Sequence, residues 1–362
     1  MTPIRIRPVH PDDAVQLHAI VSDPRVARTL VQLPSMELAE TLAWMERRTP
    51  GYHRLVAEHD GRILGAANLR QAQNPRMRHS GRIGLFVHAD HWRQGVGAAL
   101  LTALIDLADN WLNLRRLQLE VFTDHAAAIR LYERFGFAAE GVARRAVFGS
   151  GRFHDELLMA RLHRPELLPP AAQPPAAPPP RPPRRNLAIT IRPMLPDDVA
   201  AWHALRREPA VARTTAQLPS LELLRARQQA ESGSPHMHRL MAVVHEAGGP
   251  EAGEDRVVGS CHLHHHDNPR LAHTANLGMH VHPDYWGQGI GGRLLAAALD
   301  LADNWLDLQR VHLEVNTDNP PAIRLYEKYG FEIEGTHRYH IYGDGRWADS
   351  HFMGRLRPSA GE

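Results

Sequence analysis

The chain has 362 residues, of which 43% are hydrophobic and 23% charged, and its formal net charge is +2. This length suffices for two domains with separate cores, and the weak, evenly spread charge argues against nucleic acid as a partner. No segment reaches the roughly 20 apolar residues of a membrane span, the first residues do not resemble a signal peptide, and the one cysteine, Cys261, excludes an intrachain disulfide. We therefore expect a cytoplasmic protein with no membrane partner.

The first 164 residues alternate between predicted strands and helices. Ile4 to Arg7 is a short strand that ends at a proline, and Pro11-Asp12-Asp13 begins a helical region. Asp60-Gly61 lies between two apolar runs and predicts a hairpin. In chain order, further strands are expected at 54–59, 62–69, 82–88, 117–122 and 157–161, and helices at 97–112 and 127–135. This order predicts an α/β fold with a mixed, mostly antiparallel central sheet flanked by helices.

The same pattern occurs a second time. Ile4 corresponds to Ile189 in the repeated strand, an offset of 185, whereas Leu107 corresponds to Leu301 in a repeated Leu-Ala-Asp-Asn-Trp-Leu segment, an offset of 194. The second copy has therefore gained nine residues, which we place in the Gly- and acid-rich run 247–255 as a lengthened hairpin loop. Trp111 and Trp305, in the repeated segment, fall on an apolar helical stripe and are expected in the core.

Proline dominates the segment that separates the copies. Such density prevents helices and sheet ladders and favours polyproline II, so we predict a semi-rigid spacer rather than a ligand for a PxxP-binding partner. The predicted boundaries are 1–164 for the first domain, 165–186 for the linker and 187–358 for the second domain. The sequence leaves open whether the two domains pack as a pseudo-dimer or work apart.

A glycine-containing loop follows a predicted strand in each copy and opens directly onto a long helix. The segments are Val87-His-Ala-Asp-His-Trp-Arg-Gln-Gly-Val-Gly-Ala98 and Val281-His-Pro-Asp-Tyr-Trp-Gly-Gln-Gly-Ile-Gly-Gly292. Glycine lets the backbone approach an anion, and the first amides of the helix point at it unpaired. The helix dipole adds attraction for negative charge, so the pattern is typical of a phosphate-binding loop.

A second repeated block runs from Glu120 to Phe137 and from Glu314 to Phe331, with a shared Ala-Ile-Arg-Leu-Tyr-Glu core. With this block and the glycine loop present twice in the same order, each copy resembles the GNAT superfamily of N-acetyltransferases. Within it, the Gln-Leu-Pro-Ser and Asp-Asn-Trp-Leu segments are most similar to bacterial L-amino-acid N-acetyltransferases.

The resemblance implies acetyl-CoA as co-substrate and a small-molecule amine as acceptor, with no metal. The backbones of Val87 and Val281 would pair with the pantetheine arm, and Tyr132 and Tyr326 would lie beside its sulfur as catalytic acids for the leaving thiolate. Asn319, and His125 in its place in the first copy, would contact the cofactor. The pyrophosphate would be held by the amides of Arg93, Gln94, Gly95, Val96, Gly97 and Ala98, and by those of Gly287, Gln288, Gly289, Ile290, Gly291 and Gly292.

Two departures from the family pattern stand out. Trp92 and Trp286 occupy a position where the family often has Arg or Gln. His125 replaces the asparagine that the second copy keeps as Asn319, so we expect the second copy to be the more active site and both copies to bind CoA.

The sequence leaves three questions open. Glu120 and Glu314 are candidate general bases, but a strand glutamate can equally be an exposed residue, and a water chain can deprotonate the amine. By analogy with the family, Gln32-Leu33-Pro34 and Gln217-Leu218-Pro219 border the acceptor pocket, or each forms a plain turn. Histidines at 262, 264, 265, 266, 280 and 282 suggest a metal, but the first copy has other residues at the first four of these positions and no Asp or Cys spacing accompanies them, so we predict no metal site.

The sequence thus predicts acetyl transfer from acetyl-CoA to a primary amine, with the α-amine of an L-amino acid as the leading acceptor. Acetylation of a protein N-terminus or a lysine is one alternative. The other is a CoA-binding module with one degenerate domain that serves structure or regulation.

Overall fold

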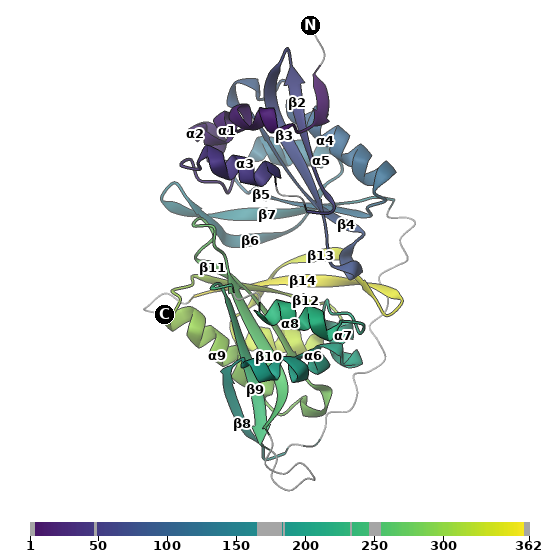
Figure 1. The fold of residues 1–362 in the computed structure, drawn as a ribbon, viewed down its shortest axis with the longest axis vertical. Helices are drawn as coiled ribbons and strands as arrows, with labels where there is room; N and C mark the ends of the chain where they lie inside the picture. Colours follow the sequence, from purple (N-terminus) through teal and green to yellow (C-terminus); the bar gives the residue numbers. More distant parts are fainter. Residues whose placement is uncertain are drawn as a thin grey trace. The chain divides into compact units, whose positions relative to one another are not determined.

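The computed structural model describes residues 4–46, 49–164, 183, 185–231, 234–245 and 255–357. The chain divides into two compact units, Met1–Pro170 and Ala171–Glu362, which we call the N-terminal and C-terminal domains. Both are mixed α/β structures with a mostly antiparallel sheet, as predicted (Figure 1). All of the predicted insertion at 247–255 except Asp255, and most of the linker at 165–186, lie outside the described residues.

The N-terminal domain has its strands in the order β1-β2-β3-β4-β5-β7-β6. The strands are β1 (Arg5–Pro8), β2 (Tyr52–His59), β3 (Arg62–Gln71), β4 (Ser80–Val87), β5 (Arg116–Phe122), β6 (Ala138–Gly149) and β7 (Arg152–Leu162). The helices are α1 (Ala14–Ser22), α2 (Pro24–Ala27), α3 (Leu38–Glu46), α4 (Val96–Asp106) and α5 (Ala126–Arg134). The predicted hairpin joins β2 to β3, with Asp60 and Gly61 both at positive φ.

The C-terminal domain repeats this order as β8-β9-β10-β11-β12-β14-β13. Its strands are β8 (Ala188–Pro193), β9 (Met237–His245), β10 (Asp255–His265), β11 (Thr274–Val281), β12 (Arg310–Asn316), β13 (Glu332–Gly343) and β14 (Arg346–Leu356). Its helices are α6 (Val199–Arg207), α7 (Pro209–Thr214), α8 (Leu223–Glu231), α9 (Ile290–Asn304) and α10 (Pro320–Lys328).

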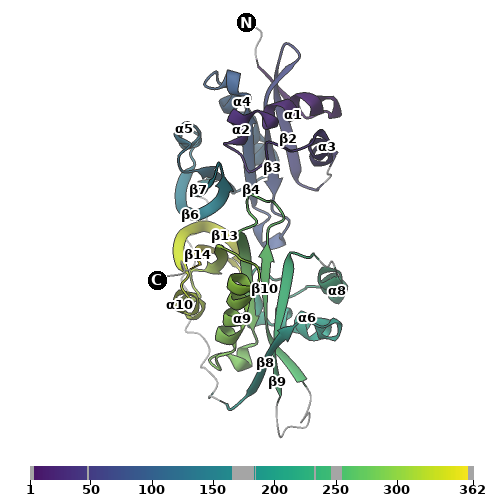
Figure 2. The same ribbon diagram turned by 90° about the vertical axis from the view of Figure 1, so that its left-hand side faces the viewer.

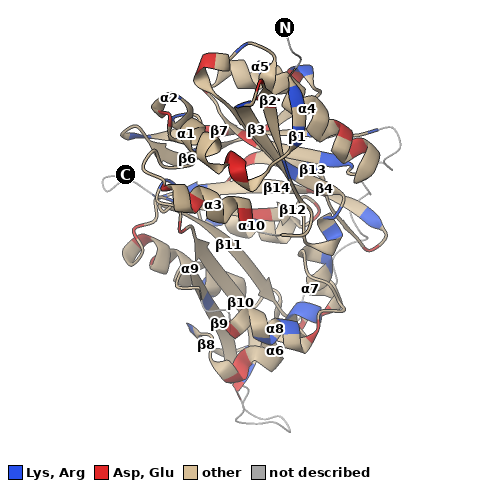
Figure 3. Cartoon of the chain, turned by 45° about the horizontal axis from the view of Figure 1, so that its top comes forward, with Lys and Arg blue, Asp and Glu red and all other residues tan. Residues whose placement is uncertain are grey.

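Helices cover both faces of each sheet, because the strands carry apolar side chains on both faces. In β2, Ala57 packs under the α4 residues Leu100 and Leu104, while its neighbour Val56 packs against Leu17 of α1 on the opposite face. Figure 2 shows the corresponding layers in the C-terminal domain, with α9 and α10 on one side of the strands and α6 and α8 on the other. Lys, Arg, Asp and Glu are interspersed along the elements of both domains (Figure 3).

Two expectations about elements were wrong. The strands β6 and β13 were not predicted, because the segment Ala138–Gly149 has charges, a glycine and two bulges in place of apolar alternation. Trp111 and Trp305 are 77% exposed and lie outside the core. In the first domain the helix widens into a π-helical turn over Leu107–Trp111, and in the second it ends before Trp305, so neither indole stays on the buried stripe.

The feature that shapes both sites is the separation of two parallel strands. β4 and β5 are paired at three positions only, from Ser80 with Arg116 to Arg82 with Gln118. β11 and β12 are paired at the three equivalent positions, from Thr274 with Arg310 to Asn276 with His312. Beyond these pairs the strands separate, and the end of β4 or β11 has a neighbour on one edge only.

A buried ion pair lies at the point where the strands begin to separate. Arg116, the first residue of β5, donates two hydrogen bonds to Glu140 of β6, at 2.8 and 2.5 Å, and both side chains are almost fully buried. Arg310 and Glu334 repeat the arrangement in the C-terminal domain. The Glu140 carboxylate neutralises the Arg116 charge at the start of β5, and the pair connects β5 to β6, the strand two places away in the sheet.

Removing one partner of this pair should destabilise the N-terminal domain strongly. Glu140→Gln leaves the Arg116 guanidinium buried without a counter-charge, which costs about 3–5 kcal/mol. The measurement is denaturant unfolding, with hydrogen exchange of the β5–β7 amides to assign the loss to this domain. Asp307→Asn is the control, because its ion pair with Arg357 is largely exposed and is worth less than about 1 kcal/mol. Equal losses in the two variants would contradict the argument.

Candidate active site

The strand ends carry the first group of site atoms. The N–H of His88 donates to the carbonyl of Leu64 in β3, at 2.8 Å. Successive N–H groups of a strand point to opposite edges, so the N–H of Val87 points into the space that β5 has left. His282 donates to Val258 in the same way, which leaves the N–H of Val281 facing the equivalent space. A ligand with an amide carbonyl could complete the edge of the sheet at this position.

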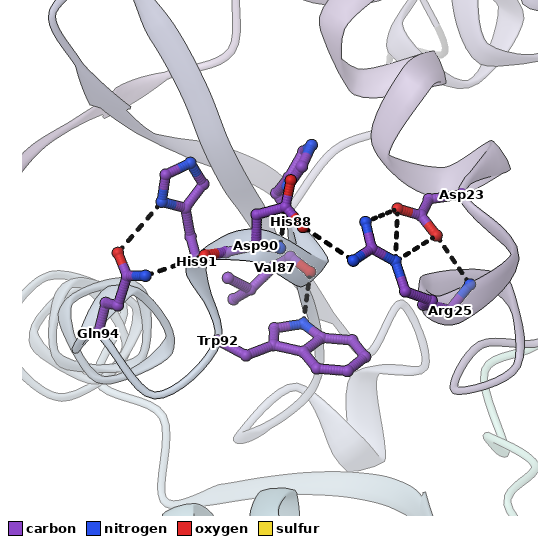
Figure 4. A network of polar contacts seen from close by, with 8 residues as sticks. All are labelled: Asp23, Arg25, Val87, His88, Asp90, His91, Trp92 and Gln94. Atoms are coloured by element: carbon purple, nitrogen blue, oxygen red, sulfur yellow. Dashed lines mark hydrogen bonds and ion pairs between the residues drawn. The ribbon is translucent and has the colours of Figure 1, made fainter.

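The two tryptophans that depart from the family pattern occupy the other half of this edge. The indole N–H of Trp92 donates to the Val87 carbonyl at 2.8 Å (Figure 4), and that of Trp286 donates to the Val281 carbonyl at the same distance. The valine carbonyl is therefore satisfied within the chain in each domain. The predicted pairing of Val87 and Val281 with a pantetheine arm is thereby restricted to their N–H groups.

The glycine loop places unpaired amides at the start of α4. Arg93 and Gly95 have φ of 61° and 86°, in the left-handed region, and a Cβ added at Gly95 would meet nothing within 4 Å. In the described structure the first N–H of this helix with a backbone partner is that of Ala99, which donates to Gly95. The amides of Val96, Gly97 and Ala98 therefore point out of the helix N-terminus, which suits a phosphate group.

The equivalent loop of the C-terminal domain has the same form. Gly287 and Gly289 have φ of 77° and 82°, and the first backbone bond of α9 is from Arg293 to Gly289. The N–H of Gln288 differs, because it makes a long bond of 3.4 Å to Tyr285. Gly97 and Gly291 serve packing as well, since an added Cβ would lie 3.2 or 3.1 Å from a leucine of the following helix.

Each loop is fixed from outside by different contacts. In the N-terminal domain Gln94 bonds the Asp90 carbonyl and the His91 ring, and Asp90 pairs with Arg25 at the start of α2 (Figure 4). In the C-terminal domain Gln288 instead accepts from the N–H of Arg185 and donates to the carbonyl of Pro183. The end of the predicted linker thus lies against the second loop.

The predicted site residues of the N-terminal domain, apart from Gln94 and Val96, meet in one cavity of about 1130 Å³. The loop residues Arg93, Gly95, Gly97 and Ala98 line it together with Val87, His125 and Tyr132. Gln32 lines it too, so this segment borders the cavity rather than forming a remote turn. Further lining residues that the sequence did not single out include Val21 of α1, Trp44 of α3, Asn68 of β3 and Glu156 of β7.

Tyr132 and Tyr326 are buried at equivalent positions, each with 6% of its surface exposed. Burial raises the pKa of Tyr132 to about 12 and raises that of Tyr326 further above the usual range. Among the described residues, neither hydroxyl has a hydrogen-bond partner. Both phenols are therefore protonated at neutral pH and can donate to an acceptor atom of a bound ligand.

Asn319 has a structural role in the described state. It is the N-cap of α10, and its side-chain oxygen accepts from the N–H of Ala322 at 3.4 Å. His125 holds the same position before α5 without a capping bond, and burial lowers the pKa of its ring. The difference between the copies is thus a difference in helix capping. The side-chain N–H₂ of Asn319 remains available for a ligand.

The comparisons with known proteins agree with this geometry. Residues 17–137 match the model of the Acetyltransferase (GNAT) family, and residues 188–332 match that of the Acetyltransferase (GNAT) domain. An L-amino acid N-acetyltransferase of Escherichia coli (strain K12) is 33% identical over 164 residues, which are 45% of this chain and 99% of that protein. The chain belongs to the GNAT acetyltransferase family.

Two further relatives are named for other acceptors. The N-alpha-acetyltransferase RimI of Mycobacterium tuberculosis is 35% identical over 130 residues, which are 34% of this chain and 70% of that protein. A spermidine N(1)-acetyltransferase of Escherichia coli (strain K12) is 24% identical over 165 residues, which are 45% of this chain and 83% of that protein. GNAT enzymes use acetyl-CoA, and the chain is an N-acetyltransferase that contains two such domains.

The candidate bases lie in different settings in the two GNAT domains. Glu120 of β5 lines the cavity and pairs with Arg82 at 3.1 Å. Glu314 of β12 is 44% exposed at its side chain and lies 3.7 and 3.8 Å from the rings of His337 and His340. The positions of Glu120 and Glu314 are compatible with a general base in either domain. Glu156, the second cavity glutamate, was missed because β7 carries no sequence motif at this point.

Two histidines of the C-terminal GNAT domain stand at positions where the N-terminal domain has other residues. His262 stands at the position of Asn68 and His280 at that of Phe86, by strand register. Burial lowers the pKa of His262 to about 4 and that of His280 to about 3. Within the described ranges, no group of three or more His, Cys, Asp or Glu side chains is arranged to hold a metal, and no helix has the length and hydropathy of a membrane span.

Replacing Trp92 should weaken CoA binding. Trp92→Phe keeps an aromatic ring but leaves the Val87 carbonyl without its donor, a loss of about 1–2 kcal/mol that loosens the strand end and the loop. We expect the Kd for CoA at the N-terminal site to rise about 5- to 30-fold, measured by calorimetric titration that resolves the two sites. Trp111→Phe, at a 77% exposed tryptophan, is the matched control. Equal Kd values in both variants would show that the indole bond does not position the loop.

The buried histidines should make the C-terminal domain sensitive to acid. Their folded pKa values lie below the unfolded value of about 6.5, so the unfolded state binds the extra protons and stability falls as the pH drops from about 6.5 towards 4. The double variant His262→Asn, His280→Phe introduces the residues of the N-terminal domain and should flatten this slope. The measurement is the Tm of the C-terminal domain as a function of pH. An unchanged slope would exclude these two rings as its cause.

Proposed function

We propose that the protein transfers the acetyl group of acetyl-CoA to the primary amine of a small molecule, with the α-amine of an L-amino acid as the leading acceptor. The observation that carries the proposal is the N-terminal cavity, in which the outward-pointing amides of the glycine loop, the free strand edge at Val87 and the protonated Tyr132 lie together. The identity with the L-amino acid N-acetyltransferase of Escherichia coli supports the acceptor class.

In this proposal the glycine loop holds the CoA pyrophosphate and the N–H of Val87 or Val281 binds an amide of the pantetheine arm. The lone pair of the neutral amine attacks the thioester carbonyl, so that a C–N bond forms and the C–S bond breaks with its electron pair on sulfur. The amine proton passes to a base, for which Glu120 is well placed in the N-terminal domain. The hydroxyl of Tyr132 or Tyr326 donates its hydrogen to the departing sulfur.

A second acceptor class is supported by a specific observation. The mycobacterial relative is named an N-alpha-acetyltransferase, so a peptide N-terminus is an alternative to the free amino acid. A screen of thiol release with amino acids, polyamines and peptides as acceptors separates these classes. CoA binding without release from any amine would favour the alternative of a binding module.

The two tyrosines should be tested separately and together. Tyr132→Phe and Tyr326→Phe should each lower kcat of their own domain about 100-fold or more with little change in the KM for acetyl-CoA, because only the proton donor is lost. Tyr329→Phe is the matched control, since the N-terminal domain has phenylalanine at this position. The tyrosine assignment is wrong if thiol release persists undiminished in both variants and in the double variant.

The assignment of the tyrosines as proton donors also predicts how the rate of acetyl transfer depends on pH. A phenol with a pKa of about 12 stays protonated up to about pH 10, so the rate should rise as the amine loses its proton and should not fall again below that pH. A loss of rate between pH 8 and 10 in the Tyr326→Phe background would contradict the role of Tyr132 as donor.

A further inference from the structure

Arg206, on α6 of the C-terminal domain, is a buried cation with an unusual set of partners. Only 7% of its surface is exposed. Its Nε and Nη2 donate to the side-chain oxygen of Gln217 at 3.0 and 2.5 Å, and its Nη1 donates to that of Gln229 at 2.8 Å. Both acceptors are neutral amides. In the part of the chain that the structure describes, no carboxylate lies within 4.0 Å of this guanidinium.

Other buried arginines of the protein are paired differently. Arg116, Arg310 and Arg355 each donate two bonds to a carboxylate, at Glu140, Glu334 and Asp303. Burying a guanidinium without an anion is costly, since amide dipoles replace only part of its hydration. Burial lowers the pKa of Arg206 to about 10, with Arg239 and Arg225 adding to the effect, and the group is still cationic at neutral pH. Among the described residues this charge is offset by the two amides and by the Trp202 ring, whose centroid lies 4.3 Å from the guanidinium carbon, and by no carboxylate.

The position of Arg206 in the repeat identifies what that charge faces. With the offset of 185, Arg206 corresponds to Val21, which lines the N-terminal cavity. Its two partners correspond to Gln32 and Trp44, which line the same cavity. By this correspondence Arg206, Gln217 and Gln229 occupy the positions of that cavity wall in the C-terminal domain, on α6, on the segment before α8 and on α8.

The neighbouring side chains also favour an anion. The positive charge of Arg206 acts on His262 and His280, which replace Asn68 and Phe86 of the N-terminal wall. The Nδ1 of His280 is buried and has no hydrogen-bond partner among the described residues. Arg239 donates to the backbone of Gln229 and adds a second cation nearby. These residues combine cations and neutral donors, and within the described ranges no acidic side chain is bonded to them.

We propose that Arg206 binds the carboxylate of the acceptor, so that the C-terminal domain acetylates amino acids while the N-terminal domain, with Val21, lacks this carboxylate site. The inference rests on the proposed acetyl transfer and adds the recognition of one substrate group to it. A guanidinium fork matches a carboxylate with two parallel hydrogen bonds, and the N–H groups of Arg206 that the glutamines leave unused can provide them.

The test compares acceptors that differ only in this group. L-amino acids and their carboxamides share the amine and side chain, but only the acids carry the negative charge. In the full chain, Arg206→Val should raise the KM for the acids about 10- to 100-fold, with the KM for the amides and for acetyl-CoA within about twofold of the unmodified protein. Arg207→Ala is the matched control, because Arg207 is the exposed neighbour on the same helix and bonds only the carbonyl of Pro219.

The outcomes separate this inference from the proposed function. A folded Arg206→Val protein with an unchanged ratio of acid to amide activity overturns the carboxylate site but leaves acetyl transfer intact. If Arg206→Val does not fold, the same comparison is made with Arg206→Lys, which keeps the positive charge but lacks the parallel N–H donors of the guanidinium. A ratio of acid to amide activity that falls several-fold supports the carboxylate site, and an unchanged ratio overturns it.

A protein that releases no thiol with any amine would refute the proposed function, and binding then decides the inference. In the presence of CoA, an L-amino acid should raise the Tm of the unmodified protein more than that of Arg206→Val. Equal shifts, or none, would mean that the glutamines alone accommodate the guanidinium and that no carboxylate binds.

Discussion

The separation of β4 from β5, and of β11 from β12, is the constraint on which the rest of each domain depends. A parallel pair that ends after three positions leaves backbone groups of the longer strand without a neighbour, and buried backbone groups must be satisfied. The chain supplies part of what is needed, because a tryptophan indole takes the carbonyl of Val87 or Val281. Among the described residues it leaves without partners the adjoining valine N–H and the first amides of the helix that follows the glycine loop. The unfilled positions form a continuous polar track along one strand end and one helix start, and an elongated phosphate-bearing thioester is the kind of ligand that such a track fits.

Several features hold this opening in place. The carboxylate of Glu140 and the guanidinium of Arg116 fix the base of β5 where the paired region ends, and Gly97 allows the helix after the loop to approach Leu131 closely. The C-terminal domain repeats both devices with Arg310, Glu334 and Gly291. The loops themselves are braced differently, by Arg25 and Asp90 in one domain and by residues at the end of the proline-rich segment in the other. The geometry of the donor site is thus the same, although the contacts outside it differ.

Much of this architecture could be predicted from the sequence. The features that were not predicted depend on contacts and backbone geometry that the local sequence pattern does not record. The glycine loops, the Asp60-Gly61 hairpin and the tyrosine helices follow from local rules about turns and helix starts, which adjacent residues obey. The strand β6 was missed because its stability comes from pairing with β7 and from the Glu140 ion pair, neither of which leaves apolar alternation in the segment. Trp111 looked buried because its spacing assumes an unbroken α-helix, and one π-turn is enough to rotate it into solvent. The prediction that Asn319 contacts the cofactor remains a prediction, and the structure adds that its side-chain oxygen caps a helix while its N–H₂ is left for a ligand.

The comparison of the two copies explains which residues can vary. Gln32 and Gln217 are the same residue at equivalent positions but have different surroundings, because α1 carries Val21 in one copy and α6 carries Arg206 in the other. An arginine cannot replace a valine in a packed wall unless its charge is satisfied, and the wall of the C-terminal domain has changed accordingly at Gln229, His262 and His280. These changes alter the polarity of the residues beside the strand end, whereas Tyr132, Tyr326 and both valine–tryptophan bonds are retained. The two copies thus share the geometry of the strand end and the glycine loop and differ in the charge of the side chains next to it, which is the kind of difference that the proposed change of acceptor requires.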